Sequence, residues 1–587
     1  MNKTRVFITS QLVALLLSAL VVTSCYTDVS TVDDRALFPA GWMFSEREEP
    51  VTASNGMVVS TDELASRIGV DIMRSGGNAV DAAVAVHFAL AVVNPEAGNI
   101  GGGGFMVTRM ADGTSAALDF REKAPLAATR DMYLDEEGNL TEKSVIGHLA
   151  AGVPGSVAGM WEAHQRFGSI DWEDLVSPAV ELANGFEVKE RFLGSLSSTM
   201  VESLSDFPAS AEQFLPRDGQ PPLVGDTLHQ PYLAETLKRI RDWGPDGFYK
   251  GETADLIVAE MERGGGIITL QDLAEYTAEW REPISFTYRG HTVISMPPSS
   301  SGGATMAEMA NILEGYDMGS MDWHGPRMIH LYAEAWKRSY ADRNHYLADP
   351  DFVDMPIDRM TSEAYARVRA STISETIATP SMEIGPGMEG PAEGENTTHY
   401  SIVDAYGNAV TVTTTINSWY GSKVTVTEAG FVLNNEMDDF AAKPGTANQF
   451  GLVQGENNAV APGKRMLSAM TPTVVVNPDG TLRMVTGTPG GATIITTVFQ
   501  TISNVLDYGM NVVDAVNAPR VHHQHLPDQI YFEPAGLDPE TVAQLQAMGH
   551  TLVERTGMSG DAQVIIVDGD LLKAWSDPRR GGRAVGY

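Results

Sequence analysis

The sequence predicts a large protein of mixed α and β structure, and three observations support this fold class. Apolar residues recur at helical spacing over residues 63–75 and 330–346, and an alanine-rich apolar run covers residues 79–93. A β-hairpin is predicted over residues 398–416, where two segments of high β-propensity flank a turn that contains Gly407 and Asn408. The chain after residue 397 is expected to be rich in strands for most of its length.

Length, composition and charge restrict the class of protein. The chain has 587 residues, of which 43% are hydrophobic and 20% are charged, as is typical of a globular protein with a large core. The formal net charge is −36, and no long cluster of Lys and Arg interrupts the acidic excess. Binding to a nucleic-acid backbone requires a basic surface, so we expect no nucleic-acid partner.

The N-terminus predicts export. Lys3 and Arg5 precede an apolar run over residues 6–22, which is the layout of a secretory signal. The run ends in Val22-Thr23-Ser24-Cys25, and Cys25 is the only cysteine of the chain, so it has no partner for an internal disulfide. This stretch resembles a bacterial lipobox, whose cysteine is lipidated and becomes the mature N-terminus. The alternative is a plain signal peptide that ends near a chance cysteine.

We therefore expect a lipoprotein signal peptide at residues 1–24 and a tether at residues 25–50. The protein would be periplasmic or at the cell surface, with the lipid on Cys25 as its membrane anchor. No later segment is apolar enough to span a bilayer.

The N-terminal half alternates short strands with helices. A strand at residues 56–60 precedes the helix at 63–75, which ends at Gly76-Gly77 as helices commonly do. The helix at 79–93 is apolar on nearly all faces, so we expect it to be buried. The four glycines before the strand at 105–108 indicate close backbone packing, because no Gly-Lys-Ser/Thr follows them as in a phosphate-binding loop.

The middle of the chain, residues 156–369, is predicted to be mostly helical with loops. Residues 374–396 lose apolar content and gain Gly, Pro and Glu, which is typical of an exposed, mobile linker. This linker leads directly into the predicted hairpin.

The register of the hairpin predicts a polar cluster. If the turn is centred on Tyr406, antiparallel pairing places Thr397 opposite Thr415, with Asn417 as a diagonal neighbour on the same face. Threonine runs in strands ordinarily reflect β-propensity alone, and Thr411 to Thr413 are interpreted in that way.

The sequence around the start of the hairpin also resembles a known processing site. Glu395-Asn396-Thr397-Thr398-His399-Tyr400-Ser401 is similar to the cleavage site of the γ-glutamyltranspeptidases, which are N-terminal nucleophile hydrolases. Further segments look like motifs of this family, in family order from about Gly56 to the C-terminus: Gly76-Gly77-Asn78-Ala79-Val80-Asp81-Ala82-Ala83, Ala97-Gly98-Asn99-Ile100-Gly101-Gly102-Gly103-Gly104-Phe105, Gly152-Val153-Pro154-Gly155-Ser156, Pro297-Pro298-Ser299-Ser300-Ser301-Gly302-Gly303, Asn434-Asn435-Glu436-Met437-Asp438-Asp439-Phe440 and Gly487-Thr488-Pro489-Gly490-Gly491. Each motif is weak alone, but together they are highly specific.

The resemblance implies an α+β fold, the four-layer αββα sandwich. It also implies that the chain cleaves itself between Asn396 and Thr397 into a large subunit, residues 51–396, and a small catalytic subunit, residues 397–587. Both subunits would contribute strands to one intertwined domain and remain together as a heterodimer.

The implied chemistry centres on Thr397 and needs neither cofactor nor metal. Its hydroxyl would attack the carbonyl of Asn396, and water would cleave the resulting ester. The freed α-amino group has an unperturbed pKa of about 7.7–8.0, so Thr397 would supply both nucleophile and base. Gly490 and Gly491 match the paired glycines whose N–H groups bind the oxyanion, although a simple Pro-Gly-Gly turn is the alternative interpretation. His399, on the same strand face, is expected to be structural.

The resemblance also assigns the substrate pocket. Arg121 would hold the α-carboxylate of a γ-glutamyl group with its fork of N–H donors, and Ser468 would add a hydroxyl. Glu436 and Asp439 would hold the α-ammonium; without the resemblance, they would be interpreted as an ordinary acidic surface loop. Asn417, together with Thr415, would complete the pocket around the nucleophile.

Two positions depart from the family pattern. Ala469 stands where the family commonly has a second serine, so one hydrogen bond to the substrate carboxylate is missing. In residues 443–451, which resemble the bacterial lid loop, Phe450 replaces the usual tyrosine and cannot donate a hydroxyl hydrogen bond to Asn417. These differences concern substrate range and the balance of hydrolysis and transfer.

The implied function is that of a γ-glutamyltransferase and glutathione hydrolase that passes the glutamyl group to water or to an amino acid or peptide. A poly-γ-glutamate depolymerase and a cephalosporin-type acylase share the fold and nucleophile and remain alternatives. From a different class, a surface binding lipoprotein with an inactive site is also considered.

Overall fold

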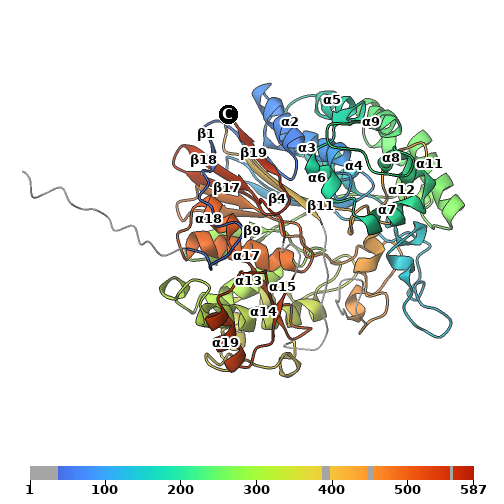
Figure 1. Cartoon of the computed structure of the whole chain (residues 1–587). Helices are drawn as coiled ribbons and strands as arrows, with labels where there is room; N and C mark the ends of the chain where they lie inside the picture. Colours follow the sequence, from blue (N-terminus) through green and yellow to red (C-terminus); the bar gives the residue numbers. More distant parts are fainter. Residues whose placement is uncertain (1–36, 387–396, 447–454, 556–559) are drawn as a thin grey trace, which may run out of the picture.

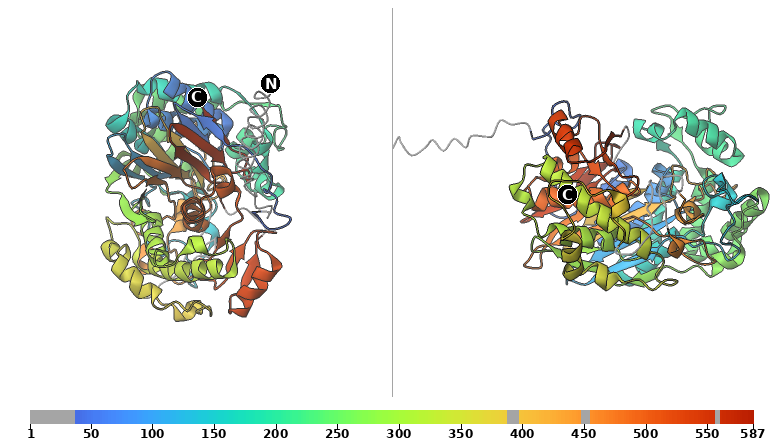
Figure 2. Two further views of the ribbon diagram at one scale, coloured as in Figure 1. Left: turned by 90° about the vertical axis from the view of Figure 1, so that its left-hand side faces the viewer. Right: turned by 90° about the horizontal axis from the view of Figure 1, so that it is seen from below.

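Two antiparallel β-sheets lie face to face, with helices on both outer sides (Figures 1 and 2). The computed structural model describes residues 37–386, 397–446, 455–555 and 560–587. The α+β architecture and its order of layers confirm the predicted αββα sandwich.

Each sheet has seven strands, and each contains strands from both sides of residue 397. The first sheet has the order β1 (Val51–Ala53), β18 (Leu571–Ser576), β17 (Gln563–Asp568), β13 (Leu482–Thr486), β12 (Thr473–Val476), β9 (His291–Ser295) and β8 (Ile284–Tyr288). The second has the order β19 (Arg583–Gly586), β2 (Met57–Ser60), β10 (Thr398–Val403), β11 (Ala409–Thr415), β3 (Gly103–Arg109), β4 (Ser115–Phe120) and β7 (Glu279–Arg281). Neither part of the chain forms a complete sheet alone.

The alternation of side chains along the strands divides the core in two. In β2, Met57 and Val59 belong to the core between the sheets, whereas Val58 faces the helices outside the second sheet. In β3, Phe105 points inward and Met106 outward in the same way. This two-residue period is the expected geometry of a pleated strand buried on both faces.

Helices form the outer layers. The outer face of the second sheet packs with α2 (Glu63–Arg74), α3 (Ala79–Val93) and α4 (Ser156–Phe167), and the apolar core on this side continues outward into α5 (Trp172–Ala183), α9 (Pro231–Trp243) and α11 (Gly251–Gly264). The core on the side of the first sheet includes α13 (Gly302–Leu313), α14 (Pro326–Tyr346), α17 (Thr493–Leu506) and α18 (Val512–Asn517). Shorter elements complete the chain: α6 (Glu190–Gly194), α7 (Ser198–Ser205), α8 (Pro208–Phe214), α10 (Asp246–Tyr249), α12 (Leu270–Ala274), α15 (Ile357–Met360), α16 (Glu363–Ala370), α19 (Pro539–Ala547), β5 (Phe186–Glu187), β6 (Thr227–Leu228), β14 (Val521–His522), β15 (Ile530–Phe532) and β16 (Leu552–Glu554).

Helix α3 shows how the sequence sets these elements. Asn78 caps its N-terminus in a reciprocal capping box with Asp81. Every residue of α3 is buried, as the uniformly apolar sequence predicts. The helix therefore lies between the second sheet and the outer helices.

Two expectations about secondary structure are confirmed, but each missed some elements. The middle segment contains β7, β8 and β9 as well as helices; β8 and β9 form a hairpin around Arg289 and Gly290, which both have positive φ. After residue 397 the chain forms not only strands but also α17, α18 and α19. Helix α17 is rich in Thr, Ile and Val, which favour strands locally, and its burial against the first sheet overrides that preference.

Residues 37–50, expected to belong to the tether, lie against the body of the protein. Phe38 and Trp42 are buried with Ala518 in a small apolar cluster. The Trp42 indole N–H donates to the Asn517 carbonyl oxygen at 2.9 Å, and the Arg579 guanidinium lies over the indole ring. This segment therefore joins the N-terminal part of the chain to its C-terminal end.

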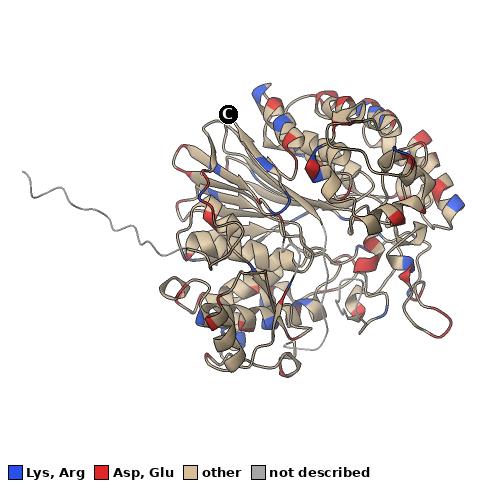
Figure 3. Cartoon of the chain, in the orientation of Figure 1, with Lys and Arg blue, Asp and Glu red and all other residues tan. Residues whose placement is uncertain are grey.

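Charged residues are spread over the outer helices and loops, while the strands carry few of them (Figure 3). Within the described ranges, no helix combines the length and apolar character that a bilayer span requires.

Replacement of Trp42 by Ala tests the packing of the N-terminal segment. Trp42 is 3% exposed, so its truncation should lower the free energy of unfolding by about 3 kcal/mol, as is typical for large-to-small changes at buried aromatic residues. Urea unfolding followed by fluorescence measures the change. The neighbouring Met43, which is 64% exposed, is the control, and Met43→Ala should change stability by less than about 0.5 kcal/mol. Equal stability of the two variants would contradict the packing.

Candidate active site

The hairpin of β10 and β11 has the predicted register. Thr398 pairs with Thr414 and Val403 pairs with Ala409, so the turn is centred on Tyr406. Continuing this register by one residue places Thr397 opposite Thr415. The backbone pairing alone thus brings these two threonines to the same end of the second sheet.

Thr397 and Thr415 are both buried and held by different contacts. The carbonyl oxygen of Thr397 accepts a hydrogen bond from Arg580 Nη1 at 3.2 Å. Thr415 Oγ1 accepts from the backbone N–H of Asn417 at 2.7 Å. Asn417 has φ = 69°, a left-handed conformation that asparagine tolerates better than most residues, and its Nδ2 donates to the Asn435 carbonyl oxygen at 3.0 Å. The chain therefore turns sharply after β11 and carries the Asn417 side chain towards the segment that contains Glu436.

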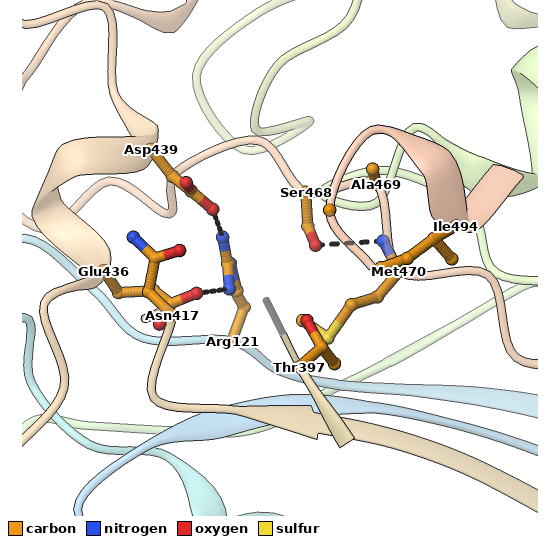
Figure 4. Close-up of a pocket in the computed structure, with 10 residues that line it drawn as sticks. Arg121, Thr397, Asn417, Glu436, Asp439, Ser468, Ala469, Met470 and Ile494 are labelled. Atoms are coloured by element: carbon orange, nitrogen blue, oxygen red, sulfur yellow. Dashed lines mark hydrogen bonds and ion pairs between the residues drawn. The ribbon is translucent and has the colours of Figure 1, made fainter. Parts of the chain in front are cut away.

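One pocket gathers most of the predicted site residues (Figure 4). Its lining combines charged, hydroxyl and apolar groups from segments far apart in the sequence: Arg121, Thr397, Asn417, Glu436, Asp439, Ser468, Ala469, Met470, Gly491 and Ile494. Of the predicted residues that the structure describes, only Thr415 and Gly490 lie outside this lining.

Arg121 follows β4 and is completely buried. Its Nη1 forms an ion pair with Glu436 and its Nη2 with Asp439, both from the short 3-10 helix η5 (Glu436–Asp439). Its Nε donates to the Met466 carbonyl oxygen at 3.3 Å. The guanidinium is thus fixed in orientation before any ligand binds, and its positive charge faces two carboxylates (Figure 4).

Burial controls the protonation of these carboxylates. It raises the pKa of Asp439 to about 6, although Arg121 acts in the opposite direction. Burial likewise raises the pKa of Glu436 well above its usual range. The site therefore holds acidic groups that titrate much closer to neutral pH than exposed carboxylates do.

The loop before α13 holds Ser468 in place. Ser468 N donates to the Ser299 carbonyl oxygen at 3.0 Å, and the Ser468 carbonyl oxygen accepts from Ser301 N and Oγ at 2.7 and 2.6 Å. The Ser468 hydroxyl oxygen accepts from Met470 N at 3.2 Å, which leaves its own proton available to a ligand. The next residue, Ala469, presents only a methyl group to the pocket.

Gly490 and Gly491 lie immediately before α17. Their φ angles are 136° and 57°, so both adopt conformations that favour glycine. Within the part of the chain that the structure describes, neither backbone N–H donates a hydrogen bond, whereas the Gly490 carbonyl oxygen accepts from Thr493 N and Oγ1. Two available N–H groups at the positive end of a helix can stabilise a developing oxyanion.

The hydroxyls beneath the pocket form a network that the sequence did not predict. The His399 ring contacts Thr413 Oγ1 at 2.8 Å, Ser401 Oγ at 3.1 Å and Thr411 Oγ1 at 3.2 Å. Burial lowers the pKa of His399 to about 3, so the ring is neutral and structural, as expected. The interpretation of Thr411 and Thr413 as ordinary strand residues is wrong, because both partner this ring between the two sheets.

Some of the site was not anticipated. Met470 and Ile494 line the apolar side of the pocket. Each lies two or three positions after a predicted site residue, Ser468 or Gly491, and this closeness in sequence was the one indication that they belong to the pocket. Arg580 had no local signal, because it is more than 180 positions from the residue that it contacts. Three predicted residues, Asn396, Phe450 and Cys25, lie outside the described residues.

Among the described residues, one further group has the composition of a metal site. His330, Glu334 and His550 lie close together in the interior. His330 Nδ1 contacts His550 Nε2 at 2.7 Å, and Glu334 forms ion pairs with both Lys337 and Arg338. These contacts satisfy the cluster through hydrogen bonds and neighbouring cations, which would oppose the binding of a further cation.

Comparisons with known proteins agree with this geometry. The family model described as gamma-glutamyltranspeptidase matches residues 65–587. The glutathione hydrolase proenzyme of Escherichia coli (strain K12) is 49% identical over 534 residues, which are 90% of this chain and 91% of that protein. The crystal structure of cephalosporin acylase from Bacillus halodurans superposes with a TM-score of 0.82 at 27% identity and covers 94% of this chain and 99% of its own. That of Helicobacter pylori gamma-glutamyltranspeptidase has a TM-score of 0.56 at 43% identity and covers 58% of this chain and 97% of its own. The chain therefore belongs to the gamma-glutamyltranspeptidase family of N-terminal nucleophile hydrolases.

Proposed function

We propose that this protein is a self-processing γ-glutamyltransferase and glutathione hydrolase. The observation that carries the proposal is the pocket in which the Thr397 side chain faces Arg121, Glu436 and Asp439 (Figure 4). The names of the relatives, which include a glutathione hydrolase proenzyme and a gamma-glutamyltranspeptidase, support the same activity.

The charges of the pocket match a γ-glutamyl group. Such a group ends in an α-carboxylate and an α-ammonium, two methylenes away from the amide to be cleaved. Arg121 and the Ser468 hydroxyl would bind the carboxylate, while Glu436 and Asp439 would bind the ammonium. The charged groups of the substrate would partly replace the ion pairs that Arg121 forms with Glu436 and Asp439. These new ion pairs would offset the free energy needed to remove the substrate's charges from water.

The reaction begins at Thr397. Its α-amino group takes the hydroxyl proton as Oγ1 attacks the γ-carbonyl carbon, and the N–H groups of Gly490 and Gly491 stabilise the oxyanion. The proton then passes to the leaving amine as the amide C–N bond breaks, which leaves a γ-glutamyl ester on Thr397. Water or the amine of an amino acid or peptide attacks this ester and regenerates the enzyme.

The same hydroxyl would generate the active enzyme. In the precursor Thr397 Oγ1 attacks the carbonyl carbon of Asn396, and the peptide C–N bond breaks, which frees the α-amino group and leaves Asn396 as an ester on Oγ1. Water then hydrolyses this ester, which releases the Asn396 carboxylate and restores the Thr397 hydroxyl. The large and small subunits then remain together as a heterodimer, because both sheets contain hydrogen-bonded strands of both.

The proposal includes export and a lipid anchor on Cys25. Its support is the arrangement of the first residues: two basic side chains, an apolar run, and Val22-Thr23-Ser24-Cys25. Attachment through a lipid would leave the enzyme domain in the periplasm or at the cell surface.

A second candidate is an acylase of the cephalosporin type, which the superposition on the Bacillus halodurans acylase favours. A dicarboxylic acyl group lacks the α-ammonium, so it would leave Glu436 and Asp439 without a ligand. Buried carboxylates without a counter-charge are unfavourable, and the pocket therefore fits a glutamyl group better.

Self-cleavage is the first test of the proposal. Denaturing electrophoresis and mass spectrometry of the purified protein should show two chains, divided between Asn396 and Thr397. Thr397→Ala should remain full length, because it lacks the attacking hydroxyl, whereas Thr397→Ser should still cleave. An intact wild-type chain would contradict the proposal.

Substrate choice separates the two candidate activities. With purified enzyme, kcat/KM for a γ-glutamyl anilide should exceed that for the matched glutaryl anilide by at least ~100-fold, because only the former carries the ammonium that Glu436 and Asp439 bind. Assays with and without an acceptor dipeptide measure how much of the γ-glutamyl group is transferred to the acceptor and how much is hydrolysed. Preference for the glutaryl compound would instead support the acylase.

The pKa of Asp439 predicts the pH dependence of binding. Below its pKa of about 6 the carboxyl is neutral and no longer attracts an ammonium. KM for the γ-glutamyl anilide should therefore rise as the pH falls through 6, by up to about tenfold per pH unit. KM for a glutaryl anilide should not rise in the same range. A constant KM for the γ-glutamyl substrate between pH 5 and 7 would contradict this role of Asp439.

A further inference from the structure

Arg580 reaches Thr397 from the C-terminal end of the chain. Its Nη1 donates to the Thr397 carbonyl oxygen at 3.2 Å, and its guanidinium carbon lies 6.0 Å from the centroid of the Trp419 ring. Trp419 belongs to the sharp turn that also carries Asn417. Arg580 therefore connects the first residue of the proposed small subunit to the loop that forms one wall of the site.

The position of this charge matters once the chain has been cleaved. Before cleavage the nitrogen of Thr397 is part of an amide and does not titrate. After cleavage it is an α-amino group, and covalent geometry places it only about 3 Å from the carbonyl oxygen that Arg580 contacts. The guanidinium then lies within roughly 6 Å of the amine, where a positive charge opposes protonation.

The opposing charges nearby compensate Arg580 only in part. Asp561, Asp577 and Glu96 are the carboxylates that act on its charge. Both carboxylate oxygens of Asp561 lack a hydrogen-bond partner among the described residues, and burial raises the pKa of Asp561 to about 7. Asp577 is bound instead by Arg520 and Arg579, and Glu96 by Arg191. Arg580 itself forms no ion pair within 4 Å among the described residues.

The other charged groups around Thr397 are themselves paired or neutral. On the pocket side, Arg121 is held between Glu436 and Asp439. On β10, the nearest titratable ring is that of His399, which is neutral. Arg580 is thus a cation in direct contact with Thr397 that has no ion-pair partner within 4 Å among the described residues.

From this geometry we propose that Arg580 is a positioning residue of the reaction: it fixes the Thr397 carbonyl and, by its charge, keeps the neighbouring α-amino group in the neutral form that can accept the hydroxyl proton. This inference rests on the proposed function of Thr397 as an N-terminal nucleophile. Arg580 lies outside the pocket lining, and in this role it contacts neither the substrate nor the reacting atoms.

The pH profile of kcat at saturating substrate tests the proposal, since it reports ionisation in the substrate complex. Arg580→Gln removes the charge but keeps a donor, so the acidic limb should move upward by about one pH unit, with kcat recovering at higher pH. Arg580→Lys keeps the charge and should leave the limb close to that of wild type. Arg583→Gln, an exposed change of the same charge three residues away, is the matched control and should leave it unchanged.

A cleaved Arg580→Gln enzyme whose acidic limb stays in place, or which loses activity equally at every pH, would overturn the proposal. If the variant does not process, the wild-type enzyme provides the test through NMR titration of ¹⁵N-threonine at position 397. A pKa of the α-amino group below about 7 supports the role, and a pKa at or above the ordinary 7.7–8.0 overturns it. A wild-type chain that never cleaves would instead refute the proposed function itself.

Discussion

The antiparallel pairing of β10 with β11 is the constraint on which the site depends. Because Thr398 lies opposite Thr414, Thr397 and Thr415 must come together at the end of the second sheet, and the turn at Asn417 must start there. A register shift of one residue would turn the Thr397 side chain to the outer face, towards the apolar residues that pack against α3. The neutral His399 ring and its hydroxyl partners secure the same register from between the sheets.

The second determinant is electrostatic. The pocket encloses one guanidinium and two carboxylates, and much of their charge is balanced within the site. Such a site is organised before ligand arrives, so a zwitterionic ligand exchanges one set of ion pairs for another. A ligand with a single negative charge would satisfy Arg121 but leave the acidic residues of η5 without a counter-ion.

Helix ends and the hairpin register could be predicted from the sequence, because interactions between residues close in the chain determine them. The ends of α2 and α3 follow from capping and glycine, and the hairpin register follows from a single turn. The grouping of Arg121 with Glu436 is different: the two lie 315 positions apart, and only the resemblance to a family brought them together. Arg580 escaped prediction for the same reason, because it lies 183 positions from Thr397 and so distant a contact leaves no periodic pattern in the sequence. Helix α17 was missed because its β-branched residues favour strand locally, while its burial against the first sheet decides the outcome.

The position of β19 at the edge of the second sheet has a consequence for the order in which the protein is made. This strand, residues Arg583–Gly586, pairs with β2, which in turn pairs with β10, and Arg580 lies three residues before it. On the ribosome residues 583–586 emerge later than β2 and β10. The sheet that carries Thr397 therefore cannot be complete until these residues have been made, although its central strands are already present. The order of synthesis thus delays the surroundings of Thr397 relative to the strand that it begins.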